Sequence, residues 1–152
     1  MVKKKINLNN NSLIEQFGMK PYKLRVKEKY MSKRQLNHFK KILNSWKGQL
    51  EQEAEKTVNH MQNDSNTLAD PNDRATQESE FGLELRTRDR ERKLIRKIQT
   101  SLIKIDDGTF GYCQETGEEI GLQRLEARPV ASLTLEAQER REITEKQFKD
   151  SR

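Results

Sequence analysis

The sequence predicts an all-α fold: a long antiparallel two-helix coiled-coil hairpin, a small globular head and a C-terminal helix. Charged residues make up 36% of the 152 residues and apolar residues 32%, whereas about 25% charged residues is usual in soluble domains. Such a composition argues against a thick core. Between Gly48 and Gly108 the only glycine is Gly82. Apolar residues in this region recur at spacings of three and four, which is typical of a helical seam.

The first long helix is expected to follow Ser32. This serine suits the N-cap, and Gln35 stands three residues later, where the partner in a capping box belongs. An apolar seam with alternating spacings of three and four then predicts a coiled coil. Without a breaker, the helix is expected to continue to residue 68. The seam residues are Leu36, Phe39, Leu43, Trp46 and Leu50.

The second long helix is expected over 72–107. Asp70 suits its N-cap, Pro71 its first position and Asp73 its first turn, where the helix dipole favours negative charge. Two helices of about 35 residues, each about 50 Å long, joined by a short turn, must pack antiparallel. The result is a rod with an acidic tip. The stripe expected to face the first helix is Phe81, Leu85, Ile95, Ile98, Leu102 and Ile105, interrupted by Arg88 and Arg92.

The rest of the chain forms the head and the last helix. Three glycines within 111–121 predict tight turns or a small hairpin. Residues 133–149 are expected to be helical, with Thr134 or Ser132 as the cap. Leu13, Ile14 and Phe17 could form a short packing helix. The predicted divisions are an N-terminal segment of the head at 1–32, the hairpin at 33–107 with its tip at 68–76, a turn-rich segment at 108–133 and the C-terminal helix at 134–152.

Several classes of protein are disfavoured. A single cysteine excludes a disulfide scaffold. No run approaches about 18 apolar residues, and the lysines at 3–5 precede polar sequence rather than a signal peptide, so we expect a cytoplasmic protein. There is no phosphate-binding glycine loop, nucleophile elbow or zinc-protease motif. His38 and His60 are expected to be surface or seam residues, and no enzymatic activity is expected.

The net charge of +6 is unevenly distributed. Residues 1–30 carry a net charge of +6 and residues 86–97 one of +5, whereas residues 62–80 carry −4. A basic rod could bind nucleic acid without sequence preference, and a plain coiled-coil adaptor is another alternative. The acidic segment between basic ones, and Asp89 and Glu91 within the arginine-rich run, argue against simple coating of DNA.

Seven segments, in one order over roughly residues 20–150, are similar to the DksA/TraR family of bacterial RNA polymerase regulators. The segments are YMS at 30–32, TVNHMQ at 57–62, DPNDRA at 70–75, LELR at 83–86, RDRERKLI at 88–95, FGYC at 110–113 and RLEARP at 124–129.

The resemblance implies a monomer that inserts its coiled-coil tip through the secondary channel of RNA polymerase and binds no DNA site and no membrane. With the alarmone ppGpp, such proteins change the lifetime of promoter open complexes. Ribosomal RNA promoters are repressed, and some amino-acid biosynthesis promoters are activated. Asp70, Asp73 and Ala75 match the family's functional tip residues.

The resemblance also implies where ppGpp acts, as a co-regulator rather than a stably bound cofactor. Lys97 and Arg128 match positions that contact ppGpp between the factor and the polymerase rim, and Leu94 matches a nearby packing position. The family's lysine in the C-terminal helix is replaced by Gln138 here, which removes one positive charge.

A second departure concerns metal. The family's four-cysteine zinc site corresponds to Cys113, Thr116, Thr134 and Ala137. Structural zinc requires four good ligands, nearly always thiolate or imidazole, so we expect no zinc and a degenerate zinc-finger-like region at 108–133. In this the chain resembles the zinc-independent members of the family. Apolar contacts and threonine hydroxyls are expected to replace the metal, and Cys113 is expected to be a buried, small apolar residue.

Overall fold

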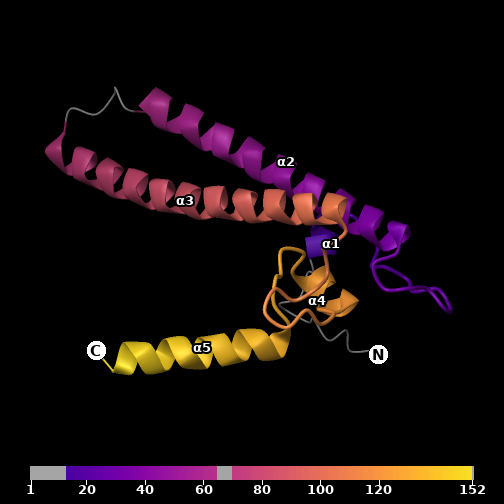
Figure 1. Cartoon of the computed structure of the whole chain (residues 1–152). Helices are drawn as coiled ribbons and strands as arrows, with labels where there is room; N and C mark the ends of the chain where they lie inside the picture. Colours follow the sequence, from indigo (N-terminus) through magenta and orange to yellow (C-terminus); the bar gives the residue numbers. More distant parts are fainter. Residues whose placement is uncertain (1–12, 65–69, 152) are drawn as a thin grey trace, which may run out of the picture.

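The structure is a computed structural model that describes residues 13–64 and 70–151. Two long helices, α2 (Lys33–Asp64) and α3 (Pro71–Asp107), lie side by side and antiparallel (Figure 1). At 37 residues, α3 is about 55 Å long. The hairpin expected from the sequence is therefore confirmed. The expectations for residues 1–12, 65–69 and 152 lie outside the described residues.

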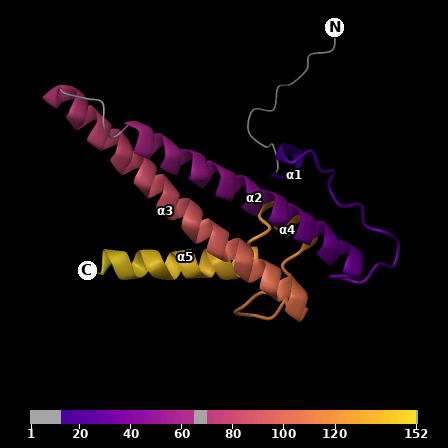
Figure 2. The ribbon, with the colours of Figure 1, turned by 90° about the horizontal axis from the view of Figure 1, so that it is seen from above.

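The head lies at one end of the hairpin (Figures 1 and 2). It contains two short helices, α1 (Leu13–Gln16) and α4 (Leu122–Ala127). The last helix, α5 (Leu135–Asp150), leaves the head and points toward the same side as the hairpin tip. The glycine-rich segment makes a single antiparallel bridge between Tyr112 and Glu119, so the described residues form no named strand and the all-α prediction is confirmed.

The caps predicted for the long helices are present. The Gln35 amide donates to Ser32 Oγ at 3.4 Å, while Gln35 Oε1 accepts from the Met31 amide at 2.7 Å. Asp70 accepts a hydrogen bond from the Asn72 amide at 3.1 Å, which satisfies an otherwise unpaired N–H of the first turn. These local hydrogen bonds set where each long helix begins.

The apolar core is confined to the head and the adjoining half of the hairpin. The buried positions nearest the tip are Leu50 on α2 and Ile98 on α3; between them and the tip no described residue of either helix is buried. The outer half is held by partly buried side chains such as Val58 and Phe81. The buried apolar residues are Ile14, Phe39, Ile42, Leu43, Leu50, Ile98, Ile105, Phe110, Cys113, Ile120, Leu125, Val130, Leu133 and Ala137.

Two details of the predicted seam are wrong. Leu85 is 50% exposed rather than turned toward α2, because the neighbouring partly buried positions on α3 are occupied by Glu84 and Arg88. Ile42 is fully buried although it lies outside the predicted seam. The head packs against this part of α2, so a wider face of the helix is covered there than in a two-helix coiled coil.

Two glycine substitutions should change stability in opposite directions. Gly111 has φ +89°, and a Cβ there would lie 2.8 Å from Met31 Sδ, so we expect Gly111→Ala to destabilise the fold by about 1–3 kcal/mol. Gly48 lies within α2 with open space around it, so Gly48→Ala should stabilise by about 0.5–1 kcal/mol. Urea unfolding followed by circular dichroism measures both, and a shift in the same direction would contradict this account.

Candidate functional site

The predicted tip residues lie at the N-terminal end of α3, which is the end of the rod away from the head (Figure 1). Asp70, Asp73 and Ala75 are all exposed. Asp70 caps the helix through one carboxylate oxygen, and Asp73 lies in the first turn. Lys97 follows Asp73 by 24 residues, which is about 36 Å along the helix. The predicted tip residues and the residues predicted to contact the alarmone therefore lie in two separate regions of the molecule.

Three of the four residues expected at the polymerase rim line one cavity of about 460 Å³, which lies between α3, α5 and the head. Lys97 comes from α3, Arg128 from the loop after α4, and Gln138 from α5. Leu94 does not line this cavity and instead packs, partly buried, against the hydrophobic core. The structure thus brings together residues that are up to 41 positions apart in the sequence.

The cavity is more basic than the sequence resemblance indicated. Arg96, Lys104 and Arg141 also line it, so five basic side chains face two acidic ones, Glu142 and Glu145. None of these additional residues was predicted. Helical spacing in the sequence could have indicated some of them, because residues seven positions apart lie on the same face of a helix. Lys97 and Lys104 have this spacing on α3, and Gln138 and Glu145 have it on α5. An anion is the ligand that such a lining favours.

The side-chain amide of Gln138 is hydrogen-bonded to residues of α4 and α5. Its Oε1 accepts a hydrogen bond from the Arg124 guanidinium, and its Nε2 donates to Glu142 at 2.8 Å. Arg124 also donates to the Leu133 carbonyl at 3.0 Å. Gln138 therefore links α4 to α5, and both ends of its amide already have partners.

The four positions that match a zinc site do not fit the metal. Cys113 is 4% exposed, and its sulfur accepts from the Thr134 amide at 3.4 Å. Thr134 Oγ also accepts from the Ala137 amide at 3.3 Å, so Thr134, rather than Ser132, is the N-cap of α5. Thr116 contacts Glu118. One thiol, two hydroxyls and a methyl group are a poor set of ligands for zinc.

The single thiol nevertheless has an unusual environment. Burial raises the pKa of Cys113, but hydrogen bonds from the Thr116 hydroxyl and from the backbone of Thr134, Thr116 and Glu115 outweigh this effect and lower the pKa to about 6. The expected burial of Cys113 is confirmed. The loop around it keeps donors directed at sulfur, which stabilise a thiolate.

Purified protein is expected to contain no stoichiometric zinc, because only Cys113 among the four matching positions has a side chain of the kind that binds structural zinc. Among the described residues, no group of three or more His, Cys, Asp or Glu side chains is placed to hold a metal ion. Treatment with a chelator should leave the melting temperature unchanged. Elemental analysis measures the metal content, and one zinc per chain would overturn this prediction.

In the part of the chain that the structure describes, no helix is both long enough and apolar enough to cross a bilayer.

The architecture is that of a coiled-coil factor: an exposed rod with an acidic end, carried on a small head with a degenerate zinc-finger loop. Residues 35–105 match the family profile of the N-terminal domain of DnaK suppressor protein DksA, and residues 108–142 match that of the prokaryotic dksA/traR C4-type zinc finger. The chain belongs to the DksA/TraR family.

The proteins to which the chain is similar support this assignment. The RNA polymerase-binding transcription factor DksA of Haemophilus influenzae is 54% identical over 136 residues, which cover 90% of this chain and 94% of the relative. The protein of the same name in Escherichia coli K12 is 51% identical, with 90% and 91% covered. The structure of transcription factor DksA2 from Pseudomonas aeruginosa matches with a TM-score of 0.72 at 36% identity and covers 77% of this chain and 90% of that one.

Proposed function

We propose that this chain is a transcription regulator that binds RNA polymerase and, together with ppGpp, remodels promoter open complexes. The names of its relatives support the partner. The observation that carries the proposal is a rod with an acidic end about 36 Å from a basic cavity. Ribosomal RNA promoters would be repressed and some amino-acid biosynthesis promoters activated. The chain would act as a cytoplasmic monomer, with no enzymatic activity and no DNA site of its own.

The proposal assigns a task to each part of the chain. The hairpin at 33–107 would enter the secondary channel, with its tip at 68–76 near the catalytic centre. There Asp70 and Asp73 would add negative charge among cations and basic side chains, which changes the local field without any chemistry, and Ala75 would allow close approach. Residues 1–32 and 108–133 would form the head, without zinc in the second of them, and 134–152 the last helix.

The basic cavity between α3, α5 and the head would face the polymerase rim and hold ppGpp. Lys97 and Arg128 supply positive charge from two different elements, as recognition of a polyanion requires. Leu94 packs beside this region. Gln138 contributes no charge, so the alarmone must be held by other cations than in relatives that have lysine there.

Transcription with purified polymerase, with and without ppGpp and after chelator treatment, tests the proposal. The chain should shorten the lifetime of open complexes at a ribosomal RNA promoter, and ppGpp should enhance this effect. Binding to polymerase core enzyme and to bare duplex DNA should be measured in parallel. Binding to DNA alone, with a steep dependence on salt, would instead support the nucleic-acid alternative. Binding to polymerase, combined with an effect on transcription that tip substitutions leave unchanged, would support a plain adaptor.

A further inference from the structure

We propose that Arg141 supplies the cation that Gln138 lacks, so that the anion site of this chain is built from Lys97, Arg128 and Arg141. The inference rests on the proposed function and adds a specificity-determining residue to its ligand site. The ligand class is a nucleotide with pyrophosphate groups, for which ppGpp is the probe. A volume of about 460 Å³ lies in the range of small-molecule sites.

The placement of Arg141 supports this role. It lies one turn after Gln138 on α5, and both residues line the cavity between α5, α3 and the loop that contains Arg128. The amide of Gln138 already has partners at both ends, Arg124 and Glu142. Among the residues of α5 that line this cavity, Arg141 is therefore the one that carries a positive charge.

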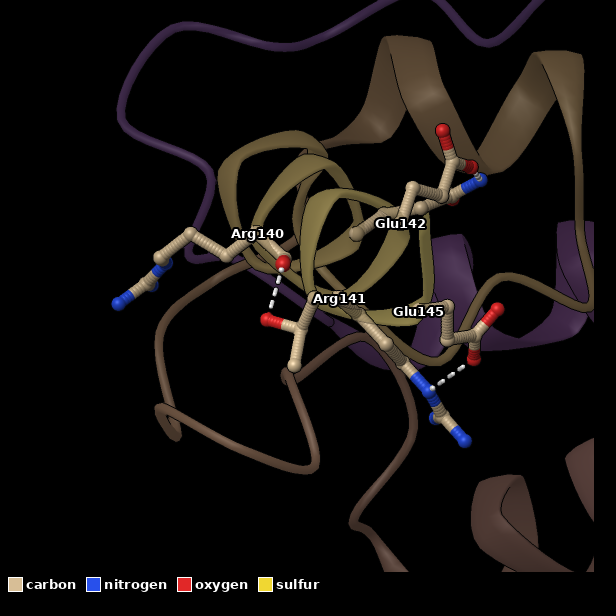
Figure 3. Close-up of polar contacts among 6 residues, drawn as sticks. Arg140, Arg141, Glu142 and Glu145 are labelled. Atoms are coloured by element: carbon tan, nitrogen blue, oxygen red, sulfur yellow. Dashed lines mark hydrogen bonds and ion pairs between the residues drawn. The ribbon is translucent and has the colours of Figure 1, made fainter. Parts of the chain in front are cut away.

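Arg141 is also available to bind a ligand. Its partner in the structure is Glu145, one turn further along α5, at 3.4 Å (Figure 3). Both side chains are more than 60% exposed, and exposed ion pairs of this kind contribute little to stability. A phosphate group, in contrast, can accept two parallel hydrogen bonds from a guanidinium. An incoming pyrophosphate should therefore displace Glu145 from Arg141.

The chain contains a matched control for this residue. Arg140 has the same side chain, neighbours Arg141 and projects from another side of α5 (Figure 3). It does not line the cavity, and its Nε donates to the Glu136 carbonyl of its own helix at 3.5 Å. Arg140→Gln and Arg141→Gln remove the same charge from the same exposed helix, so a difference between them reports position rather than net charge.

The experiment measures how much labelled ppGpp is retained by the complex of polymerase and the full chain, beyond what polymerase alone retains. Arg141→Gln should lower the affinity for this additional ppGpp about tenfold, which is the expected loss for a hydrogen-bonded charge. Arg140→Gln should change the same affinity less than about twofold, as expected for a surface charge away from the ligand. Glu145→Gln should raise this affinity by freeing Arg141. Inorganic pyrophosphate should compete with ppGpp, whereas GMP should compete poorly.

Three results would overturn the proposal. The first is equal effects of the two arginine substitutions. The second is an Arg141→Gln variant that binds polymerase more weakly to the same degree with and without ppGpp, which would assign Arg141 to a protein contact. The third is a complex that retains no more ppGpp than polymerase alone. Binding of the chain to polymerase without nucleotide is recorded separately, because failure of that step would refute the proposed function itself.

Discussion

Asp73→Asn is expected to leave binding to polymerase core enzyme intact and to abolish inhibition of a ribosomal RNA promoter. Asp73 is exposed in the first turn of α3 and lies about 36 Å along the helix from the cavity residue Lys97. The substitution removes one charge and almost no volume. A carboxylate in a first helical turn contributes only about 0.3–1 kcal/mol through the helix dipole, so the fold should remain intact.

The control is Glu78→Gln, which removes an exposed carboxylate from the same helix, closer to the head. This variant should retain most of the inhibition, because the proposal requires charge at the tip rather than a net charge on the rod. In vitro transcription gives the inhibition, and competition for core enzyme gives the affinity. Full inhibition by Asp73→Asn, or a parallel loss of binding, would refute the role of Asp73 at the tip.

Phe39→Ala should destabilise the fold more than either glycine substitution or any change at the tip. Phe39 is fully buried where α2 meets the head, and its ring centroid lies 5.5 Å from that of Phe110. Deleting a buried phenylalanine side chain costs about 3–5 kcal/mol, and domains of this size are stable by about 5–15 kcal/mol in total. Urea unfolding of the full chain, followed by circular dichroism, measures the loss.

Leu83→Ala is the control for Phe39→Ala. Leu83 is 63% exposed on the outer part of α3, so its removal should change stability by less than about 0.5 kcal/mol. Comparable losses for the two variants would mean that the core extends along the whole hairpin. A large loss in the free energy of unfolding for Phe39→Ala alone would mean that the buried contacts between hairpin and head contribute most of the stability.

The elements that the sequence predicted well are those determined by local chemistry. Ser32, Asp70 and Thr134 cap helices through hydrogen bonds to residues two or three positions away, and such pairs can be found in the sequence. The proximal seam was predicted because Phe39 and Leu43 follow the spacing of a coiled coil. In the outer half the pattern failed at Leu85, since polar residues share the partly buried face there.

The candidate site was predicted only where the resemblance supplied it. Lys97, Arg128 and Gln138 were expected, whereas Arg141 was missed. The single buried residue of α5 is Ala137, so this helix has no apolar stripe from which its facing side could be inferred. The hydrogen bond between Arg124 and Gln138 crosses 14 residues and two elements, and it depends on tertiary packing that no local pattern encodes.

The uneven placement of the core has a mechanical consequence. The half of the hairpin next to the head is locked by buried side chains, whereas the half toward the tip is held by partly covered ones. Local opening takes less free energy where fewer apolar contacts must be broken. The turns near the tip can therefore bend or fray at a lower cost in free energy than the turns next to the head, whose buried side chains keep the base of the hairpin in a fixed orientation.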